Sequence, residues 1–245
     1  MSHGDYMRPK VLVSWSSGKD SAWALHLLRL QNEVEVVGLL TTINNHFQRV
    51  AMHGTRRELL QAQAREAGLP LWEIPLPWPC PNEEYERAMA EACARAVQQG
   101  ITAIAFGDLF LEDVRKYRED RLRGTGLQPL FPVWGLNTRD LIHEMLGAGV
   151  RARIVCLDPT KLPAGFAGQD ITADLLAQLP EGIDPCGENG EFHTFVHAGP
   201  MFAEAIPVRS GEVIARDGFV YAEVFPAPLA RDSQNEVAHL GQALL

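Results

Sequence analysis

The chain has 245 residues, of which 46% are hydrophobic and 22% charged, and a chain of this length buries roughly 70–75% of the surface of its unfolded form. Its formal net charge of −9 disfavours a surface that neutralises many nucleic-acid phosphates, so no nucleic-acid partner is expected. Because the first ten residues lack the apolar segment of a signal peptide and no apolar run approaches the ~20 residues that span a bilayer, we expect a cytoplasmic protein without membrane contact.

Strands and helices alternate along the first half of the chain. Hydrophobic runs predict strands at residues 10–15, 34–42, 71–74 and 101–106, and helical spacing follows each of the first three, at residues 22–28, 55–67 and 82–99. Repeated units of this kind imply an α/β fold in which a mostly parallel sheet carries helices on both faces.

The pattern changes at residues 130–135, which are rich in proline and aromatic side chains. We place a domain boundary there, with one domain over residues 1–135 and a smaller α+β domain over residues 136–245. The second domain is expected to contain helices at residues 137–146 and 171–179, a strand at 150–157, a hairpin made of 213–215 and 220–224, and a loosely held tail from 226 to 245. The hairpin is predicted because Asp217-Gly218 supplies the positive φ that such turns need.

A short polar segment joins the first expected strand to the first helix, and it reads Ser16-Ser17-Gly18-Lys19-Asp20-Ser21. Small residues at such a junction let backbone N–H groups turn inward, and the helix adds its own free N–H groups and the positive end of its dipole. The segment therefore predicts a site for a pyrophosphate group, with Lys19 lying along it. It is not a Walker A loop, because Val13 occupies the required glycine position and Asp20 follows the lysine. The alternative is a Ser/Gly turn in which Asp20 only caps the helix.

This loop resembles the S-G-G-K-D-S loop of the PP-loop, or N-type, ATP pyrophosphatases. Further segments resemble, in the same order, the branch of that superfamily that contains diphthine-ammonia ligase: Met52-His53-Gly54, Gly107-Asp108, residues 126–134, and Gly187-Glu188-Asn189-Gly190-Glu191-Phe192-His193-Thr194. The resemblance implies a Rossmann-like ATP domain of the adenine nucleotide alpha hydrolase type, joined to a smaller domain that carries the Gly-Glu-x-Gly-Glu motif. It also implies ATP and Mg²⁺ as cofactors.

Two departures from the family pattern matter. Ser17 replaces the second glycine of the loop, which costs on the order of 1 kcal/mol if φ is positive there. Asn189, Phe192 and His193 replace glycine, tyrosine and glutamate in the second motif. We therefore expect an acceptor different from diphthine.

The resemblance assigns nucleotide binding to Ser16 through Ser21, His53, Gly107 and Asp108. Asp20 and Asp108 follow strand ends, so both are candidate ligands of Mg²⁺ together with ATP oxygens; helix capping is the alternative for each. For His53 the alternative is a surface histidine before a helix.

The second motif supplies the candidate acceptor site. Glu188 and Glu191 are flanked by glycines in a stretch without helical periodicity, so both carboxylates can face one pocket. We expect substrate contacts from Glu188, Asn189, Glu191, His193 and Thr194, with Lys19, Asp20, Glu188 and Glu191 as the catalytic set. His193 is a candidate base, and the alternatives are a solvated turn and a structural histidine.

These features together predict an ATP-dependent ligase that adenylates a carboxylate, releases pyrophosphate and forms an amide with ammonia or an amine. The acceptor is a small molecule or a protein side chain, and a homo-oligomer is left open. A tRNA-modifying PP-loop enzyme of the thiolation or lysidine type and a non-catalytic ATP sensor are the alternatives. Cys80, Cys93, Cys156 and Cys186 contain no C-x-x-C pair, which argues against sulfur transfer and for reduced, structural thiols.

One basic cluster has two interpretations. It comprises Arg115, Lys116, Arg118, Arg121 and Arg123, interleaved with Glu119 and Asp120. It forms either a solvated helix face or an anion-facing surface near the active site.

Overall fold

The computed structural model describes residues 8–50 and 54–228. His53 and the tail beyond residue 228 therefore lie outside the described residues, and the predictions made for them stay predictions. Within the described residues, no helix is long and apolar enough to cross a membrane.

The larger of two sheets lies in the first half of the chain. Its strands are β1 (Lys10–Ser14), β2 (Glu35–Asn44), β3 (Arg49–Val50), β4 (Leu71–Leu76), β5 (Ile101–Ala105) and β6 (Gln128–Leu130). The parallel strands run in the order β4-β2-β1-β5-β6, and the short β3 pairs antiparallel with the end of β2. The chain progresses outward from β1 in one direction and then returns to continue from β5 in the other. The carboxyl ends of β1 and β5 thus form a topological switch point, where α/β sheets bind ligands.

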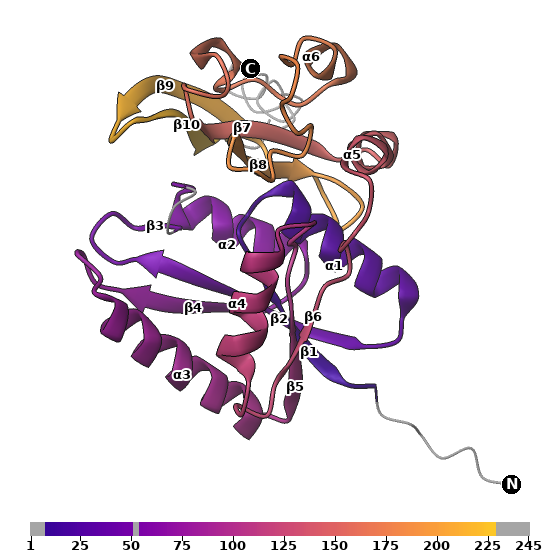
Figure 1. The fold of residues 1–245 in the computed structure, drawn as a ribbon, viewed down its shortest axis with the longest axis vertical. Helices are drawn as coiled ribbons and strands as arrows, with labels where there is room; N and C mark the ends of the chain where they lie inside the picture. The colour runs from indigo at the N-terminus through magenta and orange to yellow at the C-terminus, as the bar shows by residue number, and fades with distance from the viewer. Residues whose placement is uncertain (1–7, 51–53, 229–245) are drawn as a thin grey trace, which may run out of the picture.

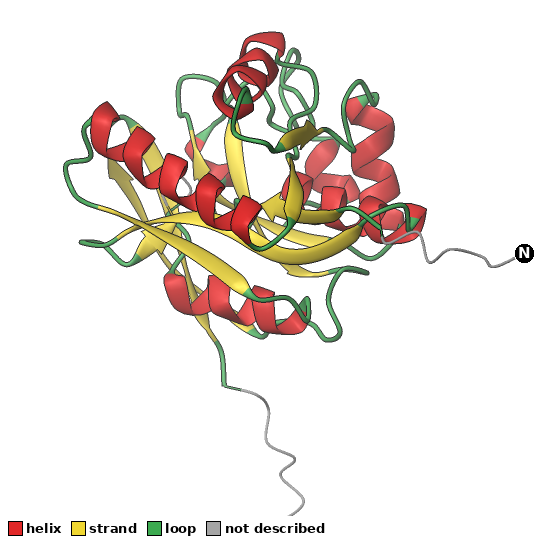
Figure 2. Cartoon of the chain, turned by 90° about the horizontal axis from the view of Figure 1, so that it is seen from below, coloured by secondary structure: helices red, strands yellow, loops and turns green. Residues whose placement is uncertain are grey.

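Helices cover both faces of this sheet (Figures 1 and 2). On one face α1 (Lys19–Gln31) and α2 (Arg57–Glu66) pack against Val11 and Val13 of β1. On the other face α3 (Asn82–Gln98) and α4 (Glu112–Leu122) pack against Leu12. Successive residues of β1 point to opposite faces, so a continuous apolar run is what a strand buried on both sides requires.

The second sheet is antiparallel. Its order is β8-β7-β10-β9, with β7 (Arg151–Leu157), β8 (Phe192–Ala198), β9 (Val208–Arg216) and β10 (Phe219–Pro226). Figure 1 shows α1 and α2 as a layer between the two sheets, α6 (Ala173–Leu176) beyond the second sheet, and α5 (Thr138–Gly147) beside it. A short 3₁₀ turn, η1 (Ala164–Phe166), follows β7. One apolar core runs from β1 through α1 and α2 into β7, β8 and β10.

The predicted fold class is confirmed: a mostly parallel sheet with helices on both faces, plus a separate smaller α+β part. The Asp217-Gly218 turn is also confirmed, since φ is 52° and 83° at the two residues. Some details differ. The helix expected over 171–179 is a single turn of four residues. The strands β3, β6 and β8 were not predicted, and the start of β8 coincides with the Gly-rich motif. The division of the chain at residue 135 stays a prediction.

Candidate functional site

The polar loop after β1 lies at the switch point. The hydroxyl oxygen of Ser16 accepts a bond from the Gly18 N–H (3.3 Å) and lies 3.1 Å from Ser21 Oγ. Ser17 has a φ of 71°, so the position that carries glycine in the family pattern does adopt the left-handed conformation. Helix α1 begins at Lys19 with no side-chain cap. Gly18, the residue before the helix, has no side chain to compete for the first N–H groups, although Thr194 Oγ1 accepts the N–H of Lys19.

Gly107 brings the end of β5 against this loop. A Cβ atom built on Gly107 would lie 2.7 Å from the carbonyl carbon of Asp20 and from the nitrogen of Ser21. No side chain fits in that space, so glycine is required for the close approach. As a result, Asp108, the next residue, follows directly beside the first turn of α1.

The second half of the chain closes over the same loop through backbone contacts. The Lys19 N–H donates to Thr194 Oγ1 (3.1 Å), and the Val196 N–H donates to the Ser17 carbonyl (3.0 Å). Gln63 of α2 bridges the two, because its amide donates to the carbonyls of both Ser17 (3.0 Å) and Val196 (2.7 Å). The structure thus brings together the two motifs that the sequence separates by about 170 residues. It assigns Thr194 a contact with the loop backbone.

The ammonium group of Lys19 points toward the second motif. The side chain is 2% exposed, and Nζ donates to Asp20 Oδ2 (2.9 Å) and to the carbonyl of Cys186. The ring of Phe192 lies 5.6 Å away. Burial alone would lower the pKa of Lys19, but Asp20, Cys186 and Glu188 outweigh it and raise the pKa. The lysine is therefore a buried cation held between the two halves of the chain.

Three carboxylates gather beside this lysine. Glu188 accepts a hydrogen bond from the Leu109 N–H at 2.8 Å, which places the second motif on the loop after β5. Burial raises the pKa of Glu188 to about 7, against the effect of that hydrogen bond and with the help of Asp20 and Asp108. Burial also raises the pKa of Asp20 and of Asp108, and Lys19 and Arg118 respectively oppose it. Clustered acids of this kind are typical of functional sites.

The remaining residues of the second motif mostly organise its loop. Glu191 is 2% exposed, and its Oε1 accepts from the Asp184 N–H (3.1 Å) and from the Asn189 side chain (3.2 Å). Its Oε2 has no hydrogen-bond partner among the described residues. His193 is the second residue of β8, and burial, with the charge of Lys19, lowers its pKa to about 4. His193 is therefore neutral at physiological pH.

A cavity of about 550 Å³ opens from the loop after β1 toward α3 and α4. Its volume is that of a small-molecule site. It is lined by the strand ends and by both helices: Ser14, Trp15, Ser16, Leu40, Thr41, Thr42, Val50, Tyr85, Glu86, Met89, Ala90, Cys93, Ile104, Phe106, Tyr117, Arg118, Arg121, Leu122 and Thr125.

The contributions of α3 and α4 to this cavity were missed by sequence reasoning. Arg118 and Arg121 line it, so for these two members of the basic cluster the anion-facing interpretation fits. Lys116 and Arg123 instead pair with Asp120 on the exposed face of α4. Helical spacing of the five cationic residues was the only signal, and it does not say which of them face inward.

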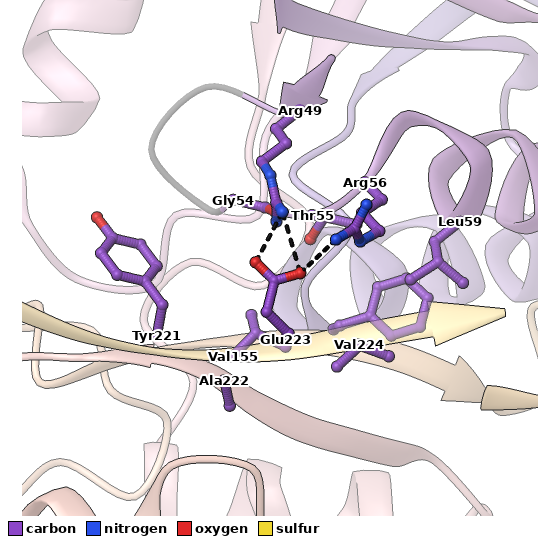
Figure 3. Close-up of a pocket in the computed structure, with 11 residues that line it drawn as sticks. Arg49, Gly54, Thr55, Arg56, Leu59, Val155, Tyr221, Ala222, Glu223 and Val224 are labelled. Carbon is purple, nitrogen blue, oxygen red and sulfur yellow. Dashed lines mark hydrogen bonds and ion pairs between the residues drawn. The ribbon is translucent and has the colours of Figure 1, made fainter. Parts of the chain in front are cut away.

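A second contact joins the two halves away from the cavity (Figure 3). Arg49 and Arg56 both point at Glu223 of β10, and each places a guanidinium nitrogen 2.7 Å from its carboxylate. The space beside them is about 20 Å³, room for a single water molecule and not for a substrate. These ion pairs hold the two halves of the chain together and do not form a binding site.

Comparisons with known proteins agree with this geometry. The model of the diphthamide synthase N-terminal domain matches residues 9–129, and the model of the C-terminal domain matches residues 137–223. The chain belongs to the diphthamide synthase family. Within the PP-loop superfamily this is the branch that the loop and the Gly-Glu-x-Gly-Glu motif indicated.

Among curated relatives, the human diphthine–ammonia ligase is 30% identical over 151 residues, and the bovine protein is 28% identical over 150. Each alignment covers 59% of this chain and 56% of the relative, so the chain matches little more than half the length of these relatives. The protein of Schizosaccharomyces pombe is 24% identical over 223 residues, which are 84% of this chain and 37% of the relative. The solved U34-tRNA thiolase of Methanococcus maripaludis superposes with a TM-score of 0.35 at 17% identity over 58% of each chain. A superposition this partial carries no argument.

Proposed function

We propose that this chain is an ATP-dependent, AMP-forming amide ligase. It adenylates a carboxylate, releases pyrophosphate, and forms an amide with ammonia or an amine. The observation that carries the proposal is the contact between the two motifs: Glu188 of the second motif accepts the Leu109 N–H, directly after the Gly107-Asp108 segment that packs on the phosphate loop. The groups proposed for the nucleotide and those proposed for an acceptor thus lie at one switch point.

The described residues fit ATP. Thr41 Oγ1 lines the cavity, is buried, and has no hydrogen-bond partner among the described residues, so the polar edge of a base would satisfy it. The phosphates would then lie beside the hydroxyl groups of Ser16 and Ser21, at the start of α1, which has no side-chain cap from Gly18. In the proposed reaction ATP supplies the adenylyl group.

The described residues also fit Mg²⁺ as a partner of the nucleotide. Asp20 Oδ1 is buried without a hydrogen-bond partner among the described residues, and carboxylate oxygen is the ligand that Mg²⁺ prefers. Residues 8–50 and 54–228 contain no group of three or more acidic, histidine or cysteine side chains that could hold a metal alone. Asp20 and Asp108 would therefore bind Mg²⁺ together with phosphate oxygens, the usual arrangement for this ion.

The acceptor is proposed to differ from diphthine, on which the curated relatives act. Phe192 and His193 replace a tyrosine and a glutamate of the family motif, and both lie near Lys19. A neutral histidine in place of a glutamate removes a negative charge from the acceptor side of the site. We therefore expect an acceptor that is less cationic than diphthine at this point.

A sulfur-transfer function has less support. Burial raises the pKa of the Cys186 thiol to about 12, and Sγ donates to the Thr138 carbonyl at 3.4 Å. A thiol in this state is not the thiolate that nucleophilic sulfur chemistry needs.

The test is an assay of products. The full chain is incubated with Mg-ATP, ammonium and a panel of carboxylic acids, and AMP, pyrophosphate, ADP and phosphate are separated. We expect AMP and pyrophosphate in equal amounts, dependent on one class of acid and absent without it. ADP and phosphate as the products would contradict the proposal.

A further inference from the structure

A bound polyphosphate brings up to four negative charges, and the site must supply cations in addition to N–H groups. Lys19 is the cation of the phosphate loop, but its Nζ is already engaged by Asp20 and by the Cys186 carbonyl, and its side chain is 2% exposed. Lys19 is not among the residues that line the cavity, whereas Arg118 and Arg121 are. The positive charge that faces the cavity therefore comes from Arg118 and Arg121 of α4.

Arg118 lines the cavity and contacts the segment that packs on the phosphate loop. Its Nε is 3.4 Å from Oδ2 of Asp108, the residue that follows Gly107 at the first turn of α1. Its guanidinium carbon lies 5.1 Å from the centre of the Phe106 ring, and both residues line the cavity. The ring limits the positions of the guanidinium plane, which reduces the entropy lost when a ligand binds. Arg121 lies one turn further along α4 and is paired with Glu86 of α3 at 2.7 Å.

The contact of Arg118 with Asp108 differs from the structural ion pairs of this protein. Arg49 holds Glu223 through two hydrogen bonds of 2.7 and 3.0 Å, and Arg153 holds Asp170 through two of 2.7 and 3.1 Å. Arg118 touches Asp108 through one long contact, with its side chain 31% exposed. Most of its five N–H donors thus remain available for a planar, bidentate contact with an oxyanion.

From these contacts we propose that Arg118 binds the phosphate chain of the nucleotide. The proposal rests on the proposed function in so far as the ligand is ATP. Asp108 holds the guanidinium beside the start of α1, Phe106 sets its plane, and a phosphate at the loop completes its hydrogen bonds. Lys19 then serves the contact between the two halves, and Arg118 neutralises the ligand.

Calorimetric titration of the full chain with Mg-ATP and with adenosine tests this. Arg118→Ala is expected to raise the dissociation constant of ATP about tenfold or more, the cost of one charge-assisted hydrogen bond, and to change that of adenosine less than twofold. Arg118→Lys keeps the charge but cannot form the planar, bidentate contact of a guanidinium. Its dissociation constant for ATP is therefore expected to lie between those of the wild type and Arg118→Ala. Lys116→Ala removes a cation from the exposed face of the same helix and should leave both constants unchanged.

Equal weakening of ATP and adenosine would overturn the proposal, because Arg118 would then only shape the cavity. No weakening of either, or no binding of ATP by the wild type, would overturn it as well. Melting temperatures of the variants within about 2 °C of the wild type exclude misfolding as the cause of any loss. The ligase proposal fails separately: a wild type that binds ATP in an Arg118-dependent way but releases no AMP with any acid would remove the ligase activity and leave the role of Arg118.

Discussion

The two sides of the candidate site are built differently. On the side of the second motif, Lys19, Thr194 and Glu191 are at most 3% exposed. Lys19 donates hydrogen bonds to Thr194 and to the Cys186 carbonyl, and Glu191 accepts one from the Asp184 N–H. On the side of α3 and α4, an open cavity is lined by side chains such as Arg118 and Tyr117 that remain partly exposed. The closed side holds the two halves of the chain together, and the open side has room for a ligand.

Because of this difference, the effect of a substitution on stability can be separated from its effect on ligand binding, which an activity assay alone cannot do. A substitution on the closed side removes a contact of the fold and a group of the site at once. A substitution of Arg118 on the open side removes the proposed ligand contact and, from the fold, one long contact with Asp108. Stability and ligand affinity, measured on the same variants, should therefore diverge across the site.

The largest effect is expected for Lys19→Ala. The substitution removes the partner of the largely buried Asp20 carboxylate and the donor to the Cys186 carbonyl, a loss of roughly 3 kcal/mol for a broken buried pair. We expect ATP binding to weaken and turnover to be abolished together with a clear loss of stability. Denaturant unfolding and ATP titration on the same protein check this, with the exposed Lys10→Ala as the matched control. Lost ATP affinity at unchanged stability would mean that Lys19 belongs to the open side.

The next effect concerns the two glutamates of the second motif. Glu188→Gln and Glu191→Gln are expected to reduce amide formation about a hundredfold or more, the cost of a lost positioning or general-base group. Affinity for ATP should stay within about threefold, a difference below ~1 kcal/mol. Product formation and ATP dissociation constants are measured on both variants, with the exposed Glu181→Gln as the control. Equal loss of both quantities would place these acids at the nucleotide, and loss of neither would remove them from the mechanism.

Glu188 should also make stability depend on pH. Its pKa in the folded chain, about 7, exceeds its ordinary value of 4.5. Its stabilising contribution is therefore complete below pH 4.5 and is lost as the pH rises through 7. Because the side chain is partly exposed, we expect a loss on the order of 1–2 kcal/mol across this window, relative to Glu188→Gln. Urea unfolding of both proteins at pH 4.5, 6 and 8 measures it, and parallel curves would contradict the raised pKa.

The sequence was informative where chemistry is local. The loop at Ser16–Ser21, the individual strands at residues 10–15, 34–42, 71–74 and 101–106, and the Asp217-Gly218 turn each depend on a few consecutive residues, and the structure confirms the strands and the turn. What could not be predicted depends on contacts between distant residues. Lys19 donates a hydrogen bond to the carbonyl of Cys186, 167 positions away, and the Leu109 N–H donates to the carboxylate of Glu188, 79 positions away. Likewise, Tyr85 and Arg118 are ordinary helix residues by their spacing, and only the packing of α3 and α4 on the sheet turns them toward one cavity.

The smallest expected effect tests the backbone of the phosphate loop. Ser17 has a positive φ, which costs about 1 kcal/mol for a residue with a Cβ, but its Oγ lies 2.7 Å from Thr55 Oγ1 in a buried hydrogen bond. Ser17→Ala keeps the strain and loses the bond, whereas Ser17→Gly loses both. Glycine should therefore be more stable than alanine by about 1 kcal/mol, and neither should exceed the wild type, because the unpaired Thr55 hydroxyl costs at least as much as the strain. Thermal unfolding of the three proteins orders them as serine, glycine, alanine. If alanine proved as stable as glycine, the loop would relax on substitution, and the closed side of the site would be less rigid than its hydrogen bonds indicate.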